Sequence, residues 1–246
     1  MSNGNNVYQF GPNAYTKPAA GLYMLRQTIM GPELFDAAFR TYSQRWMFKH
    51  PTPADFFRSM EDASAFDLDW FFRGWFYTTD YTDIAVKEVN QFHVTDKPTQ
   101  EVIELAARYN VKVEDLGPRL YLTKEGEATD TKEVPVLKNY LESKDNSSLE
   151  APNFFYEIVF EKPGGLVMPI IVEYSYADGT KKRETYPAEI WRFNDKEVTK
   201  LIPSNKEIVG IQVDPDLETA DVDVSNNAWP KQEETKFDEV KNKVKG

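Results

Sequence analysis

Few side chains in this 246-residue sequence could carry out acid–base or metal chemistry. It contains no cysteine and only two histidines, His50 and His93. It also lacks the H-E-x-x-H zinc motif, the G-x-S-x-G nucleophile turn, and glycine-rich loops of the G-x-x-x-x-G-K-[ST] or G-x-G-x-x-G type. His50 falls in a predicted loop and His93 at the end of a predicted strand, so we interpret both as structural rather than catalytic. Any histidine-rich metal site must therefore lie outside these residues.

One acidic stretch, from Asp214 to Asp223, resembles a calcium loop at first sight. Oxygen-rich loops do bind calcium. However, the spacing differs from the EF-hand pattern, and the glycine needed for its sharp turn is missing. We therefore favour a solvated strand end over a specific ion site.

The composition argues against several classes of binding partner and site. Asp and Glu number 40 against 29 Lys and Arg, which gives a formal net charge of −11. We expect no nucleic-acid partner, because phosphate binding needs clustered basic side chains. No apolar run approaches the roughly 20 residues of a membrane span, and no basic-then-apolar start indicates a signal peptide. The absence of cysteine excludes disulfides and Cys-ligated zinc.

The first third of the chain is rich in aromatic residues and predicts consecutive helices. Between Tyr8 and Tyr81 lie 19 of the 34 aromatic residues. Apolar side chains recur at helical spacing over residues 15–30, after Gly31-Pro32 and after Thr52-Pro53. Glycine is a common C-terminal cap, proline a common first helical residue, and threonine a common N-cap. A fourth helix is predicted over residues 68–77 with Asp67 as its cap; it is apolar on nearly every side, so we expect it to be buried.

The rest of the chain predicts mainly antiparallel strands. Apolar residues alternate over residues 154–160 and 166–176, and Asp178-Gly179 is a strong hairpin signal that tolerates positive φ at both positions. We expect the next strand to run on to Trp191 and Phe193. Two more strands are predicted over residues 198–202 and 208–213, and serial hairpins of this kind indicate a sandwich.

These elements predict an α+β fold, with a helical part over residues 1–80 and an antiparallel β-sandwich-like domain over residues 81–230. The signal is mixed near residues 96–150, where we expect an irregular or helical insertion that includes a helix over residues 100–109. Residues 231–246 form a charged tail.

Two segments of the helical part together resemble the M1 family of zinc aminopeptidases, which are thermolysin-like gluzincins. They are Tyr15-Thr16-Lys17-Pro18, which opens a helix, and Thr52–Phe57 followed by Leu68–Trp75. In that family a tyrosine two residues before a lysine starts a helix after the zinc-binding helices, and later helices follow in this order. The resemblance covers roughly residues 7–90 and 154–230, where Gly164–Pro169, Pro187–Arg192 and Asn226–Pro230 look like the region after the catalytic domain in bacterial members.

The resemblance implies a role for Tyr15. In M1 enzymes a zinc-bound water attacks the scissile carbonyl, and the glutamate of H-E-x-x-H is the general base. The family's tyrosine donates a hydrogen bond to the oxyanion that forms. A phenol is ordinarily neutral at pH 7 and can act as this donor. The resemblance also implies a thermolysin-like catalytic domain for the helical part and a peptide as the substrate.

The zinc half of such a site is missing from the sequence. The family's zinc ligands lie before this tyrosine, but residues 1–14 contain neither histidine nor glutamate. We therefore expect a C-terminal portion of an M1-like enzyme that is metal-free and inactive by itself, with zinc bound in the full-length protein. We also expect the helices of residues 15–78 either to expose apolar surface or to bury it by self-association.

Two other interpretations stay open. The chain could be a non-catalytic β-sandwich binding or scaffolding module, which exposed Trp and Tyr on the sandwich loops would favour. Alternatively, the full-length protein could be a pseudo-enzyme of the same family. By analogy with bacterial members, we expect a periplasmic or exported location for the full-length protein.

Overall fold

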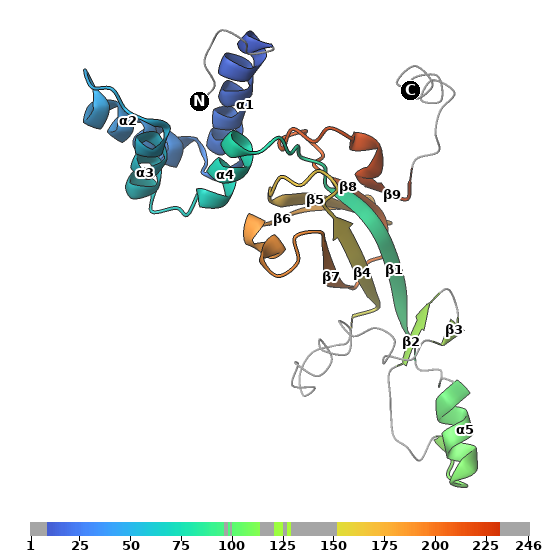
Figure 1. Cartoon of the computed structure of the whole chain (residues 1–246). Coiled ribbons are helices and arrows are strands. Elements are labelled where there is room, and N and C mark those ends of the chain that lie inside the picture. The colour runs from blue at the N-terminus through green and yellow to red at the C-terminus, as the bar shows by residue number, and fades with distance from the viewer. Residues whose placement is uncertain are drawn as a thin grey trace, which may run out of the picture.

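The computed structural model describes residues 9–95, 98, 100–113, 121–124, 127–128 and 152–231. These residues form helices and antiparallel sheets, which confirms the α+β class. Helices α1 to α4 gather beside two sheets, and α5 lies beyond the far end of β1 (Figure 1). The tail of residues 232–246 and most of the insertion lie outside the described residues.

The helical part follows the expected order. A π-helical turn, Pro12–Thr16, leads into α1 (Lys17–Met24), and a second π-helical turn, Leu25–Ile29, follows it. The remaining helices are α2 (Pro32–Trp46), α3 (Pro53–Ser64), α4 (Asp69–Tyr77) and α5 (Gln100–Arg108).

The starts of α2 and α3 confirm the local signals. Gly31 separates the second π-helical turn from α2 with φ of 82°, a conformation that glycine adopts readily. At the start of α3, Thr52 and Asp55 form a capping box, in which the Thr52 amide and hydroxyl donate to the Asp55 carboxylate at 2.8 and 2.7 Å. The prediction of Asp67 as the cap of α4 is wrong by one residue: Leu68 is the N-cap and no side chain caps the helix, although Asp67 accepts from the Asp69 amide at 3.3 Å.

Helix α4 is less buried than its sequence predicts. Phe71, Phe72 and Trp75 are buried, but Tyr77 is 67% exposed. One face of α4 packs into the core, and the other face is exposed to solvent. Aromatic residues on nearly every side of a helix are therefore not enough to show that the helix is buried.

The strands form two sheets with antiparallel neighbours. The five-stranded sheet has the order β3-β2-β1-β4-β7, and the four-stranded sheet the order β6-β5-β8-β9. Their bounds are β1 (Ala85–Thr95), β2 (Tyr121–Lys124), β3 (Glu127–Ala128), β4 (Phe154–Glu161), β5 (Ile170–Tyr176), β6 (Lys181–Tyr186), β7 (Glu197–Ser204), β8 (Ile208–Val213) and β9 (Ala228–Trp229).

One detail of the strand prediction is wrong. The strand predicted to continue to Trp191 and Phe193 ends at Tyr186, and a 3₁₀ helix, Ala188–Arg192, follows. Pro187 precedes this helix and cannot donate to a strand ladder. The hairpin predicted at Asp178-Gly179 is confirmed as the β5–β6 hairpin, in which Gly179 alone of the two has positive φ, at 83°. Three residues separate Tyr176 from Thr180, so the loop needs one glycine-like position, not two.

The larger of two hydrophobic clusters in the described residues joins the sheets and the helices, and a smaller one contains Phe92 and Phe155. Tyr156, Ile158 and Phe160 of β4 share it with Val172 and Tyr174 of β5. The same cluster includes buried side chains of the helical part, namely Met24, Leu25, Met60, Phe71 and Phe72. The chain passes from α4 to β1 over residues 78–84, where the core continues across the predicted domain boundary.

Candidate functional site

Tyr15, the residue that the resemblance marks as catalytic, lies in the first π-helical turn and is 68% exposed. Its ring meets the edge of the Phe10 ring, with centroids 6.0 Å apart. The phenol is therefore held near a helix start rather than enclosed in the core. It is accessible to a ligand, although no described residue completes a catalytic pair with it.

Trp75 of α4 fixes the helix that carries Tyr15. Its indole nitrogen donates to the Lys17 carbonyl at 3.0 Å, and the Lys17 ammonium lies 5.7 Å from the ring centre. Gly21 allows this close approach, because a Cβ there would lie 2.1 Å from the Trp75 nitrogen. Helix α4 thus determines the position of α1, and of Tyr15 two residues before Lys17.

The π-helical turns on either side of α1 change the direction of neighbouring side chains. Such turns are rare and are frequent at functional sites. In the second turn, Arg26 forms a two-pronged ion pair with Asp36 of α2 at 2.7 and 2.8 Å. Thr28 in the same turn donates to the Glu218 carbonyl at 2.9 Å. The second turn connects α1 to α2 and to the β part, and Tyr15 lies in the first turn, at the other end of α1.

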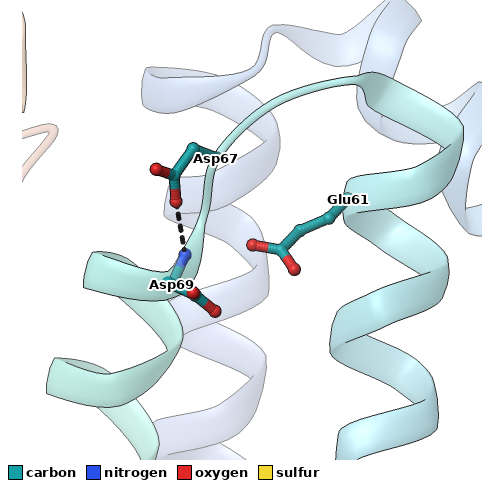
Figure 2. Close-up of side chains that lie close together, drawn as sticks. All are labelled: Glu61, Asp67 and Asp69. Atoms are coloured by element: carbon teal, nitrogen blue, oxygen red, sulfur yellow. Dashed lines mark hydrogen bonds between the residues drawn. The ribbon is translucent and has the colours of Figure 1, made fainter.

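A group of three carboxylates, Glu61, Asp67 and Asp69, lies between α3 and α4 (Figure 2). One oxygen of each lies within 4.8 Å of the others. Glu61 accepts from the Leu68 amide at 2.9 Å and Asp67 from the Asp69 amide, so both shape the loop between the helices. Catalytic zinc sites use histidine or cysteine besides carboxylates, so this group does not fit zinc.

An open pocket of about 440 Å³ lies beside these carboxylates. Four aromatic side chains, Phe57, Trp70, Phe72 and Tyr77, line it together with Asp69 and Arg73. Aromatic walls with a few charged groups are typical of ligand pockets. Tyr15 does not line this pocket, so the pocket is a separate feature of the helical surface.

The two histidines have no catalytic surroundings among the described residues. His50 is exposed in the loop between α2 and α3. His93 lies within β1 rather than at its end, with its ring against Phe154 and its nitrogen 3.2 Å from the Gln91 amide. Neither belongs to a described group of potential metal ligands. The structural interpretation of both residues remains the simpler one.

Buried ionisable groups in the β part satisfy one another. Tyr174 and Tyr186 share a hydrogen bond of 2.9 Å, and Tyr186 donates to Glu184 at 2.6 Å. Burial raises the pKa of both tyrosines, so they stay protonated. Burial likewise lowers the pKa of Lys162, which donates to the Gly165 carbonyl at 2.6 Å. These contacts hold turns and strands together.

The interpretation of residues 214–223 as a solvated strand end is wrong for part of the stretch. Asp214 is only 1% exposed, and its carboxylate accepts from the Glu218 amide and from the amide and hydroxyl of Thr219. Asp221 accepts from the Ile84 amide at 3.0 Å. Burial raises the pKa of Asp221, and the nearby Asp83 carboxylate adds to this rise. A buried loop needs such acceptors for its own amides.

Similarity to known proteins does not assign this chain to a family. No protein-family model matches the sequence, and no curated protein matches it. In the described ranges, no helix has the length and apolar content that would cross a bilayer. The likeness to M1 peptidases therefore rests on the motifs of the sequence.

Several polar groups that the structure brings together carry no motif in the sequence. Asp83 and Ile84 lie beside Asn226 and Asn227, more than 140 positions later. The Glu61–Asp67–Asp69 group is closer in sequence, yet its spacing matches no metal motif. The sequence signals near the first group were the Asn226–Pro230 segment of the resemblance and the acidic stretch that ends at Asp223, and neither predicts these contacts, since the partners meet only in the tertiary structure.

Proposed function

We propose that this chain contributes the oxyanion-binding tyrosine and part of the helical wall of an M1-like zinc metallopeptidase that acts as an aminopeptidase in its full-length form. The observation that carries the proposal is the 68% exposed Tyr15, on a helix start that Trp75 anchors. Exposure leaves the hydroxyl free to donate to a peptide carbonyl, while the anchor limits its movement.

The role of Tyr15 follows from the chemistry of acyl transfer. When a nucleophile adds to the scissile carbonyl, negative charge develops on the carbonyl oxygen. A neutral phenol in position stabilises that charge and needs no proton transfer to do so. Removing one such donor typically costs about 2.7–4 kcal/mol of barrier, a factor of about 100–1,000 in kcat.

Zinc does not fit the donors of the described residues. The one described group of three potential ligands is Glu61, Asp67 and Asp69, which contains no nitrogen donor and serves the loop between α3 and α4. In the family, zinc supplies the activated water. Its ligands and the general base would have to come from residues that this sequence does not contain.

The alternative, a binding or scaffolding module, has less support. Trp191 of the β part is 3% exposed and donates to the Met168 carbonyl at 2.9 Å, and Trp229 is half-buried. Aromatic recognition would need such rings at the surface. Phe193, Tyr81 and Tyr109 are 98%, 50% and 69% exposed, but they lie on three separate segments of the chain.

Self-association of the helical part also remains a prediction. The rings of Tyr23, Phe48 and Tyr77 in this part are exposed. This agrees with the first of the two expected outcomes, in which the helices expose apolar surface. Exposed apolar surface of this kind is compatible with association but does not demonstrate it.

Two observations test the proposed function. The purified chain, incubated with zinc and an aminoacyl-arylamide, should release no arylamine, and robust turnover would overturn the proposal. The coding sequence directly upstream of Met1 should encode an H-E-x-x-H helix followed by a glutamate ligand. A secretion signal or an unrelated domain there would support the binding-module alternative instead.

A further inference from the structure

The pocket at α3 and α4 contains two opposite charges that have no ionic partner among the described residues. Asp69 and Arg73 both line it, and both are exposed. They lie four positions apart on α4, a spacing at which opposite charges commonly pair. The ion pairs of the described residues nevertheless include neither side chain. Each charge is therefore available to a ligand group of the opposite sign.

The side of the pocket at Asp69 is acidic. Glu61, Asp67 and Asp69 each bring one carboxylate oxygen within 4.8 Å of the others (Figure 2). Glu61 and Asp67 accept from backbone amides of the loop, whereas the Asp69 carboxylate accepts from no group of the described residues. The neighbouring carboxylates make the potential at Asp69 negative and so favour a ligand ammonium group there. Arg73, one turn further along α4, supplies the opposite charge.

Contacts within the protein hold the aromatic walls of the pocket in place. The Phe57 and Phe72 rings are stacked with their centroids 4.3 Å apart, and the Tyr77 ring meets Phe57 edge-on at 6.0 Å. The Trp70 indole nitrogen donates to the Asp67 carbonyl at 3.1 Å. These rings keep their positions without a ligand, and small-molecule sites are usually pre-formed in this way.

We propose that this pocket binds a free α-amino acid with an aromatic side chain. Such a zwitterion carries its ammonium group and its carboxylate on one carbon atom, so it can bridge Asp69 and Arg73 on consecutive turns of α4. The ammonium group pairs with the Asp69 carboxylate, and the ligand carboxylate accepts N–H bonds from the Arg73 guanidinium. The aromatic side chain of the ligand packs against Trp70 and Tyr77.

Size and charge argue against other classes of ligand. The volume of about 440 Å³ is near the lower end of the range of about 300–1,000 Å³ for small-molecule pockets, which suits a single amino acid. A quaternary ammonium ion would suit the rings and Asp69, but it would lie beside the like charge of Arg73. An aromatic acid would pair with Arg73, but its carboxylate would lie near that of Asp69. A zwitterion pairs with both side chains.

Titration of the full chain with four probes, followed by amide NMR signals, tests the pocket. L-phenylalanine has the ring and both charges, phenethylamine lacks the carboxylate, phenylpropionate lacks the ammonium group, and L-alanine lacks the ring. We expect L-phenylalanine to shift the signals of α3 and α4 with a Kd of about 1 mM, the affinity of a small ligand in an open pocket. The other three probes should bind about fivefold more weakly or worse, because each lacks one contact.

Two variants test the two charges of the ligand separately. Asp69→Asn should weaken the binding of phenylalanine and phenethylamine about fivefold and leave that of phenylpropionate no weaker. Arg73→Gln should weaken the binding of phenylalanine and phenylpropionate and leave that of phenethylamine no weaker. The control Arg58→Gln removes the charge of an exposed residue that follows Phe57 on α3 but does not line the pocket, so it should bind as the wild type does. Thermal unfolding checks that each variant is folded.

Several results would overturn the proposal. One is the absence of any phenylalanine-dependent shift in the α3 and α4 signals. Equal binding of phenethylamine would assign the pocket to cations instead, and equal binding of phenylpropionate would assign it to acids. An Asp69→Asn or Arg73→Gln variant that binds phenylalanine as the wild type does would also contradict it. The pocket does not include Tyr15 and the titration measures binding without hydrolysis, so this result is independent of the proposed peptidase function.

Discussion

The helical part and the β part of the molecule bury their aromatic side chains to different extents. In the β part, Tyr156 and Tyr174 are fully buried between the sheets, and the hydroxyl of Tyr156 accepts from the Ile208 amide at 2.8 Å. In the helical part, Phe48 and Tyr77 are 99% and 67% exposed. The sheets cover each other, whereas the helices cover only one side of their own aromatic residues.

This difference separates two uses of aromatic residues. Rings in the β part stabilise the fold, because both sheets contribute to one interior. Rings on the outer side of the helices make ring contacts on one edge but leave most of their surface uncovered by the described chain, so that surface is available for a ligand or another polypeptide. Tyr15 belongs to this second group, which is why its exposure matters for the proposed function.

The largest expected effect is on stability, from a truncation in the shared core. Phe160→Ala should lower the free energy of unfolding by about 3–5 kcal/mol, because it removes a fully buried ring. Urea unfolding followed by circular dichroism measures this change. Phe193→Ala, at a 98% exposed position, should stay within about 0.5 kcal/mol of the wild type.

The same experiment tests whether the two parts share one core. Helix and sheet signals of Phe160→Ala should shift together along the urea axis, since the buried cluster spans both parts. Two separate unfolding transitions, with the midpoint of the helix signal unchanged from the wild type, would show that the helical part and the β part unfold as independent domains.

A smaller effect is expected at the contact that positions Tyr15. Gly21→Ala places a Cβ 2.1 Å from the Trp75 nitrogen, so the indole must move and its bond to Lys17 is strained. Overpacking of this kind costs about 1–3 kcal/mol, measurable by thermal unfolding. Gly11→Ala is the matched control, because no atom lies within 4 Å of its added Cβ. Equal stability of the two variants would contradict the proposed anchor.

The smallest effect concerns pH and the start of α3. Hydrogen bonds from the Thr52 hydroxyl and amide hold the pKa of Asp55 below its ordinary value. The ionised form is thus favoured by folding, and the stabilisation is fully present above about pH 4. It is lost as pH falls through the lowered pKa. The Tm difference between the wild type and Asp55→Asn should therefore shrink on acidification, whereas a constant difference would argue against this origin.

The sequence predicted the helices well because their signals are local. Proline at the first position of α2 and α3, the Thr52–Asp55 box and Gly31 each act within a few residues. The strands were predicted less completely. The path after Tyr186 was missed, because an alternating pattern cannot show that Pro187 leads into a 3₁₀ turn.

The candidate functional residues also differ in whether a local sequence signal predicts them. Tyr15 was accessible to sequence reasoning through its motif, and its role stays a prediction. The polar contacts of Asp83 and Ile84 with Asn226 and Asn227 were not accessible, since these residues meet only after the sheets form. The burial of Asp214 was missed for the same reason, because charge alone predicts exposure.

The central claim is that the Tyr15 hydroxyl stabilises an oxyanion, and Tyr15→Phe in the full-length enzyme tests it directly. Steady-state hydrolysis of an aminoacyl-arylamide should show kcat reduced about 100–1,000-fold with KM little changed. Tyr23→Phe, on α1 directly after the turn that carries Tyr15 and 65% exposed, is the control and should leave kcat unchanged. A Tyr15→Phe enzyme that keeps the wild-type kcat would contradict the account.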